Sequence, residues 1–225
     1  LKANSNYMDF YAGALMAADS LKRMGEDVTI NLIDQNKFNV SQMPQGTIVG
    51  PVRYSDMERF LPLAGTGNIV VSPMDINTGK LVAGNSNFVQ IAPSADDQTT
   101  NLMDLLATKT TLGNSVMIIY ERNGEDLPLV EKVKDLANER GIVFNTLSYN
   151  ILEGREMMEK IKDALEPGLD NLVLIPSNSE AFVNDVVRNL NLMIHQKYKV
   201  VLYAPSRIRS FETIEVDNLH NSNLL

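Results

Sequence analysis

Hydroxyl, amide and carboxylate side chains follow two short apolar runs, Thr47–Val49 and Ile69–Val71. Neither run alternates with polar residues, which is typical of strands covered on both faces, and a short helix capped by Ser55 or Asp56 fits between them. In an open sheet of parallel strands, ligands bind beyond the carboxyl ends of the strands. The predicted chemistry is therefore recognition of a small polar molecule, and the candidate residues are Tyr54, Ser55, Ser72, Asp75 and Asn77.

A second polar loop follows the predicted strand Ser115–Tyr120. Its carboxylates Glu121, Glu125 and Asp126 could bind a cation or an amine. The alternative is a solvated loop, with Glu125 and Asp126 near the start of the next helix, where the helix dipole favours acidic residues. Both interpretations stay open at the level of the sequence.

Four cationic or titratable residues were weighed as partners of an anion or as catalysts. Arg122 and Arg207 follow strand ends and could hold a carboxylate or a phosphate with two hydrogen bonds, or they could be ordinary surface arginines. His195 lies near the end of a predicted helix, where a cation complements the dipole. His220 lies in a tail without a clear pattern.

Complete catalytic and nucleotide-binding motifs are absent from the sequence. Gly65-Thr66-Gly67 lacks the third glycine of a dinucleotide fingerprint, and Gly79-Lys80 is followed by Leu81 where a phosphate loop has Ser or Thr. There is no G-x-S-x-G motif. With no cysteine and only two histidines, thiolate chemistry and a three-histidine metal site are excluded. We predict a protein that is not an enzyme and that carries neither a cofactor nor a metal.

The amino-acid composition limits the classes of molecule that this chain could bind. The 225 residues carry a net charge of −8, which argues against a surface for nucleic acid or for anionic lipid. No apolar run is long enough for a transmembrane segment, and no signal peptide is visible. The expected partner is a small molecule or another protein.

The order of predicted elements indicates an α/β protein. Strands and helices alternate along the whole chain, and the pattern starts again near Gly113. We expect two doubly wound lobes, residues 1–112 and 113–225, each with a parallel sheet between two helical layers and with a cleft between the lobes. The predicted strands are Val28–Ile33, Thr47–Gly50, Ile69–Ser72, Phe88–Ile91, Ser115–Tyr120, Ile142–Leu147, Leu172–Ile175 and Val200–Tyr203.

The order of these motifs resembles the type I periplasmic binding proteins, in particular the leucine/isoleucine/valine-binding branch. The resemblance rests on Gly50-Pro51 before a helix, Ser72-Pro73 after a strand, the stretch Phe88–Gln98 before a helix, and Phe10-Tyr11-Ala12-Gly13 in the first helix. It covers nearly the whole chain. By this resemblance, a first strand would precede Leu1 and the chain would return to the first lobe after Leu225. The resemblance implies a solute-binding protein of the periplasm or cell envelope, of the kind that serves ABC transporters.

The positions that bind amino acids in that family carry other residues here. Tyr54-Ser55 and Ser72 are kept, whereas Met74 and Asp75 stand where small residues and threonine hold a carboxylate. Tyr120 and Arg122, at the end of a predicted strand, are also candidates. The remaining candidate positions, carried over in the same way, are Glu125, Ser177, Asn178 and Ser206. Glu125 replaces an aromatic residue, Ser177 and Asn178 replace a tyrosine, and Ser206 replaces the acid that pairs with the ammonium group. A zwitterion buried without such partners costs several kcal/mol, so we do not expect a standard α-amino acid.

Two hypotheses of different class remain. In the first, the chain is a non-catalytic solute-binding domain for a polar or cationic molecule near Asp75 and Glu125. In the second, it is an interaction module that has lost its ligand and acts by protein contact. The resemblance extends to envelope proteins of that second kind, including activators of cell-wall synthases and domains that follow LysM peptidoglycan-binding modules.

Overall fold

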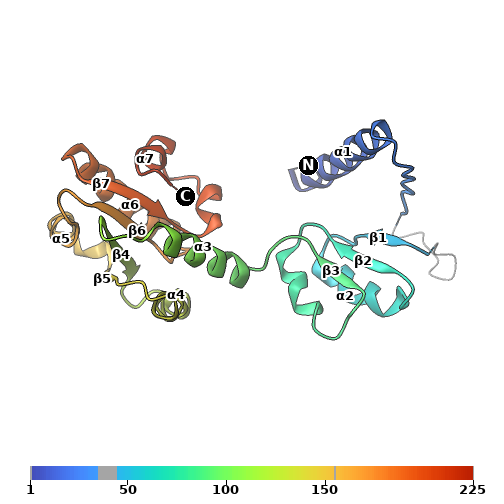
Figure 1. Ribbon diagram of the computed structural model, residues 1–225, viewed down its shortest axis with the longest axis horizontal. Helices are drawn as coiled ribbons and strands as arrows, with labels where there is room; N and C mark the ends of the chain where they lie inside the picture. The colour runs from blue at the N-terminus through green and yellow to red at the C-terminus, as the bar shows by residue number, and fades with distance from the viewer. Residues whose placement is uncertain (1, 35–44, 155, 225) are drawn as a thin grey trace. The chain divides into compact units, whose positions relative to one another are not determined.

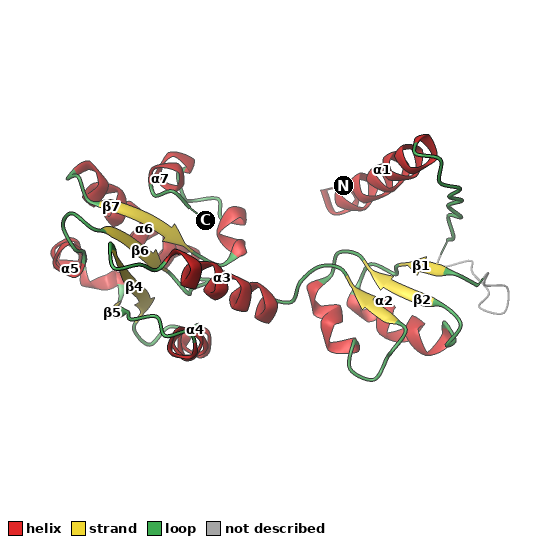
Figure 2. Ribbon diagram, viewed as in Figure 1, coloured by secondary structure: helices red, strands yellow, loops and turns green. Residues whose placement is uncertain are grey.

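The computed structural model describes residues 2–34, 45–154 and 156–224, which form two compact units, Leu1–Val89 and Gln90–Leu225. Each unit contains a parallel β-sheet with helices packed against it, so the predicted α/β class is confirmed (Figures 1 and 2). The sequence-based boundary between residues 112 and 113 lies after helix α3 (Ala95–Lys109), whereas the compact units divide before it. The reason is that Met103 and Leu106 of α3 pack into the core of the second unit.

The first unit is built on a three-stranded sheet in the order β1-β2-β3. Strands β1 and β2 are parallel, with Val49 opposite Val71. One face of this sheet packs against the helices that follow β1 and β2. The elements are α1 (Lys2–Arg23), β1 (Thr47–Val49), α2 (Tyr54–Phe60), a 3₁₀ turn (Leu61–Leu63), β2 (Ile69–Ser72), a second 3₁₀ turn (Ile76–Leu81) and β3 (Phe88–Gln90).

The core of the first unit lies on one face of its sheet. Val70 and Phe88 pack there against Met57 and Leu61. On the other face, Val49, Ile69 and Val89 keep 55%, 52% and 47% of their surface exposed. The layer expected on this face is therefore not seen among the described residues, and Met8 and Met16 of α1 are likewise exposed.

The predicted strand Val28–Ile33 is not formed. Its residues are described without strand pairing, and Val28, Ile30, Leu32 and Ile33 are exposed. A run rich in β-branched residues favours a strand, but a strand is stabilised by the neighbour with which it exchanges hydrogen bonds and side-chain contacts. No described strand pairs with this segment.

The second unit has a four-stranded parallel sheet in the order β5-β4-β6-β7. In this order the chain leaves β4 first toward one edge and then crosses to the other. The elements that follow α3 are β4 (Asn114–Glu121), α4 (Leu127–Glu139), β5 (Asn145–Tyr149), a 3₁₀ turn (Ile151–Glu153), α5 (Glu156–Ala164), β6 (Asp170–Leu174), α6 (Glu180–His195), β7 (Lys199–Tyr203), a 3₁₀ turn (Ser206–Ser210) and α7 (Val216–Asn221).

Both faces of this second sheet are covered. Met117 and Ile119 of β4 point into one core, which is shared with α5 and α6. Val116 and Ile118 point into the other core, which is shared with α3 and α4. This alternation follows from the pleat of a strand and produces the three-layer arrangement expected for this lobe.

The two edges of the second sheet differ. At the β7 edge, the backbone N–H of Leu202 donates to the carbonyl of Ser222 at 2.9 Å, and the Asn223 side chain donates to the carbonyl of Val200 at 3.2 Å. Glu180 on α6 fixes the same tail by accepting hydrogen bonds from Glu212 and Thr213. The tail therefore covers the β7 edge.

Candidate functional site

The loops that follow β4 and β6 meet at the carboxyl ends of these neighbouring strands. Asp126 lies between β4 and α4, and Ser177 and Asn178 lie between β6 and α6. One carboxylate oxygen of Asp126 accepts hydrogen bonds from the Ser177 hydroxyl at 2.9 Å and from the Asn178 backbone N–H at 2.7 Å. The other oxygen accepts from the Asn178 side-chain amide at 2.8 Å. We call these hydrogen bonds of Asp126 with Ser177 and Asn178 the loop tie. They join two segments that are about fifty residues apart in the chain.

The electrostatics of the loop tie keep Asp126 ionised. Burial alone would raise the pKa of Asp126, but hydrogen bonds from Asn178 and Ser177 outweigh burial and hold that pKa below its usual value. Ser177 is itself buried, with 3% of its surface exposed.

Asp126 stands at the N-cap position of α4, so the prediction that it lies near the start of a helix is confirmed. Its side chain makes no capping hydrogen bond there. It binds the neighbouring loop instead. Of the two residues considered with it, Glu125 is exposed, while Glu121 is half-buried at the end of β4.

Arg122, a candidate for binding an anion, already has partners on its own unit. Its guanidinium donates to the carbonyl of Ser148 at 2.9 Å and forms an ion pair with Glu153 at 3.3 Å. Glu153 also pairs with Lys160 at 2.9 Å. Hydrogen bonds from the backbone of Asn150 and from Lys160 hold the pKa of Glu153 below its usual value.

The other predicted site residues of the second unit contact residues outside the loop tie. Tyr120 packs against the core beside α4, with the Lys134 ammonium 4.6 Å from the centre of its ring. The Ser206 hydroxyl donates to Gln98 on α3. Of the candidates in this unit, the structure thus brings together Ser177 and Asn178, and their common partner is Asp126.

In the first unit, Asp75 occupies a comparable place after β2. One carboxylate oxygen accepts from the backbone N–H of Tyr54, the first residue of α2, at 2.8 Å. The other oxygen accepts from the backbone and side-chain nitrogens of Asn77 at 2.9 and 3.0 Å. Burial alone would raise the pKa of Asp75, but these hydrogen bonds from Asn77 and Tyr54 lower it. Asp75 therefore caps both α2 and the following 3₁₀ turn.

Helix α2 begins one residue before the predicted cap. Arg53 is the N-cap residue, and Ser55 and Asp56 already lie in the first turn. The cap prediction is wrong because the carboxylate of Asp75 supplies the hydrogen bond that a local Ser or Asp usually supplies. The Tyr54 hydroxyl donates to Glu58 on the same helix at 2.9 Å.

Ser72 is fully buried, and its hydroxyl oxygen lies 2.8 Å from the hydroxyl of Thr78. The Thr78 hydroxyl also lies 2.7 Å from the carbonyl of Asp75. The sequence analysis did not select Thr78, although a threonine three residues after an N-cap aspartate is a recognisable signal of a capped turn. Met74 is part-exposed and lies in the same loop.

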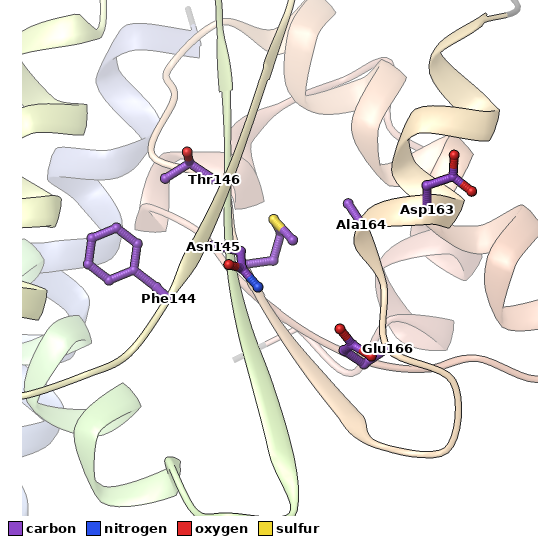
Figure 3. A pocket seen from close by; sticks show the side chains of 7 residues that line it. Phe144, Asn145, Thr146, Asp163, Ala164 and Glu166 are labelled. Carbon is purple, nitrogen blue, oxygen red and sulfur yellow. The ribbon is translucent and has the colours of Figure 1, made fainter.

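An open depression of about 620 Å³ lies elsewhere on the second unit, beside strand β5 (Figure 3). It contains none of the predicted site residues. Its lining residues come from β4, from β5 and the residue before it, and from the end of α5 and the turn that follows: Met117, Phe144, Asn145, Thr146, Asp163, Ala164 and Glu166. Within the described ranges, no group of three or more His, Asp or Glu side chains is arranged to hold a metal ion.

No protein-family model and no curated protein sequence matches this chain. Across the described parts of the chain, none of the helices combines the length and apolar character needed to cross a lipid bilayer. The functional argument therefore depends on the geometry of the two units.

Proposed function

We propose that this chain is a non-catalytic interaction module of the cell envelope, similar in type to the periplasmic binding proteins, which acts through contact with another protein. The observation that carries the proposal is the loop tie. Asp126 uses both carboxylate oxygens on Ser177 and Asn178, at the strand ends where a doubly wound sheet binds its ligands. A ligand that used these groups would have to break three hydrogen bonds to a charged acceptor, each of them costly to lose.

The first unit supports the same proposal. Asp75, the residue selected for a cationic ligand, has both oxygens engaged with Tyr54 and Asn77. Its capping role explains why a carboxylate stands in this loop without invoking a ligand.

The proposal is tested by a thermal-shift screen against amino acids, polyamines, sugars and peptidoglycan fragments. A ligand at 100 times its dissociation constant stabilises a protein by about 2.7 kcal/mol, which raises the melting temperature by several degrees. The module proposal expects no such shift with any of these solutes. A reproducible shift that disappears in Asp126→Ala would contradict it.

A second candidate function is binding of a small polar or cationic solute, with Glu125 as the charged contact. It is favoured by the exposure of Glu125 in the same loop as the loop tie. If this function holds, a polyamine stabilises the wild type, and Glu125→Ala removes its binding in calorimetry. Unchanged affinity in this variant would exclude Glu125 as the charged contact.

A further inference from the structure

Strand β5 forms the edge of the second sheet opposite to β7. At its carboxyl end, the backbone N–H of Arg122 donates to the carbonyl of Tyr149 at 2.7 Å, so Tyr149 directs its backbone toward β4. Successive residues of a strand direct their backbone groups to opposite edges. Thr146 and Ser148 therefore direct their N–H and C=O groups outward, away from the sheet.

The open depression lies along the amino-terminal half of this edge. Figure 3 shows Asn145 on the strand side, and Asp163, Ala164 and Glu166 on the side of α5 and its following turn. The turn is fixed, because the buried side chain of Asn171 bonds to both the backbone N–H and the carbonyl of Glu166. Among the described residues, β4 is the strand that pairs with β5, and no strand pairs with its outer side. A groove between an exposed strand edge and a helix is the geometry in which domains accept an extended peptide as an additional strand.

The surroundings of the groove define the chemistry of its occupant. Asp163 and Glu166 are both exposed, and both line the depression on the side of α5 and its following turn. Val143, just before the strand, exposes 87% of its surface. An occupant that carries both cationic and apolar side chains complements this surface, whereas an acidic segment is repelled.

At the carboxyl-terminal half of the β5 edge, an outward carbonyl group is already hydrogen-bonded. The Arg122 guanidinium donates to the outward carbonyl of Ser148, and a charged side chain at an edge discourages indiscriminate pairing with other strands. Pairing is thereby restricted to the stretch beside the depression, around Thr146.

We propose that the β5 edge is a docking site for an extended polypeptide segment bearing lysine or arginine, which adds as a strand beside Thr146 with a basic side chain near Asp163 and Glu166. This inference deepens the proposed function and rests on it, because it names the surface and the class of partner of the interaction module.

The test uses fluorescence anisotropy of the full chain with two labelled hexapeptides, one alternating valine and lysine and the other valine and glutamate. Only the lysine peptide is expected to bind. Thr146→Pro, which removes an outward N–H at a position where an edge strand tolerates proline, should weaken binding about tenfold, whereas Thr146→Val should not. Asp163→Lys with Glu166→Lys should also weaken it about tenfold, and Asp135→Lys with Glu139→Lys on α4 serves as the control with the same change of charge.

Each outcome decides the inference. Failure of the wild type to bind the lysine peptide, or equal binding by Thr146→Pro and Thr146→Val, would overturn it once circular dichroism shows that the variants are folded. Spermidine binding as tight as the peptide would also overturn it, because it would identify a site for small cations. The solute screen separates this inference from the proposed function: a solute shift that depends on Asp126 contradicts the function, while loss of peptide binding with a silent screen contradicts only the docking site.

Discussion

The two units use an aspartate in the same topological place for different purposes. In the first unit, Asp75 follows β2 and caps two short helical segments, all within about twenty residues of the chain. In the second unit, Asp126 follows β4 and binds the loop after β6, so that it fastens two neighbouring strands of the sheet to each other. The first arrangement completes local structure, while the second closes the strand ends of a sheet.

The sheets that carry these residues differ as well. The second sheet has a core on each face, whereas the first has its core on one face and leaves Val49, Ile69 and Val89 exposed on the other. We infer that most of the burial energy lies in the second unit, since the free energy gained on folding scales with the apolar surface removed from water. Mutations of comparable size should therefore have unequal effects in the two units.

The largest expected difference concerns apolar residues at the sheets. Phe182→Ala removes a fully buried ring that contacts Tyr149, and it should destabilise the chain by about 3–5 kcal/mol. Ile69→Ala, at a half-exposed position of β2, should cost about 1 kcal/mol or less. Urea unfolding followed by far-UV circular dichroism measures both. Equal losses in the two variants would contradict the inferred imbalance between the units.

The second-largest expected change in stability concerns the loop tie. Asp126→Ala removes the acceptor of the buried Ser177 hydroxyl and of two donors of the exposed Asn178, which can bond to water instead, and we expect a loss of about 1.5–3 kcal/mol in the free energy of unfolding. Glu125→Ala, one residue away and exposed, is the matched control and should change stability by less than about 0.5 kcal/mol. Similar values for the two variants would show that the tie contributes little.

The capping carboxylate of the first unit should matter less. Asp75→Ala removes the acceptor for Tyr54 and Asn77 and should cost about 1–2 kcal/mol, the usual range for the loss of a helix cap. Asp75→Asn keeps an acceptor oxygen and should recover part of this loss. The same unfolding experiment measures both variants, and a cost for Asp75→Ala above that of Asp126→Ala would reverse the comparison.

The smallest expected effect is on the pH dependence of the free energy of unfolding. The pKa values of Asp126 and Asp75 are lowered in the folded chain, so each stabilises folding above its unfolded pKa and loses that contribution as the pH falls through its folded pKa. Stability should be level near neutrality and decline below about pH 5. Asp126→Asn should flatten this decline in urea titrations at several pH values, and a decline as steep as that of the wild type would exclude Asp126 as a source.

Local features of the fold were predictable from local sequence. Ser94 caps α3 in a reciprocal capping box with Asp97, and Ser179 caps α6; serine is among the residues preferred at this position. The strand predicted at Ile142–Leu147 is found at Asn145–Tyr149, a shift typical of boundaries that hydrophobic pattern alone determines. The strand predicted at Val28–Ile33 is not formed, because a strand depends on a neighbouring strand that local sequence does not specify.

The candidate site was less predictable for the same reason. Ser177 and Asn178 were selected, and Asp126 was predicted either to bind a cation or to lie near the start of its own helix, but its hydrogen-bond partners lie 51 and 52 residues further along the chain. Only the strand order β5-β4-β6-β7, which places β4 beside β6, brings these loops together.

The measurement that tests the account most directly is a double-mutant cycle between Asp126→Ala and Asn178→Ala, read out by urea unfolding. If the carboxylate is committed to the neighbouring loop, the two substitutions should be strongly non-additive, with a coupling energy of about 1–3 kcal/mol. Additive effects would show that Asp126 and Asn178 act independently in solution. In that case the polar groups at the strand ends would be free to hold a ligand, and the solute-binding function would become the better account.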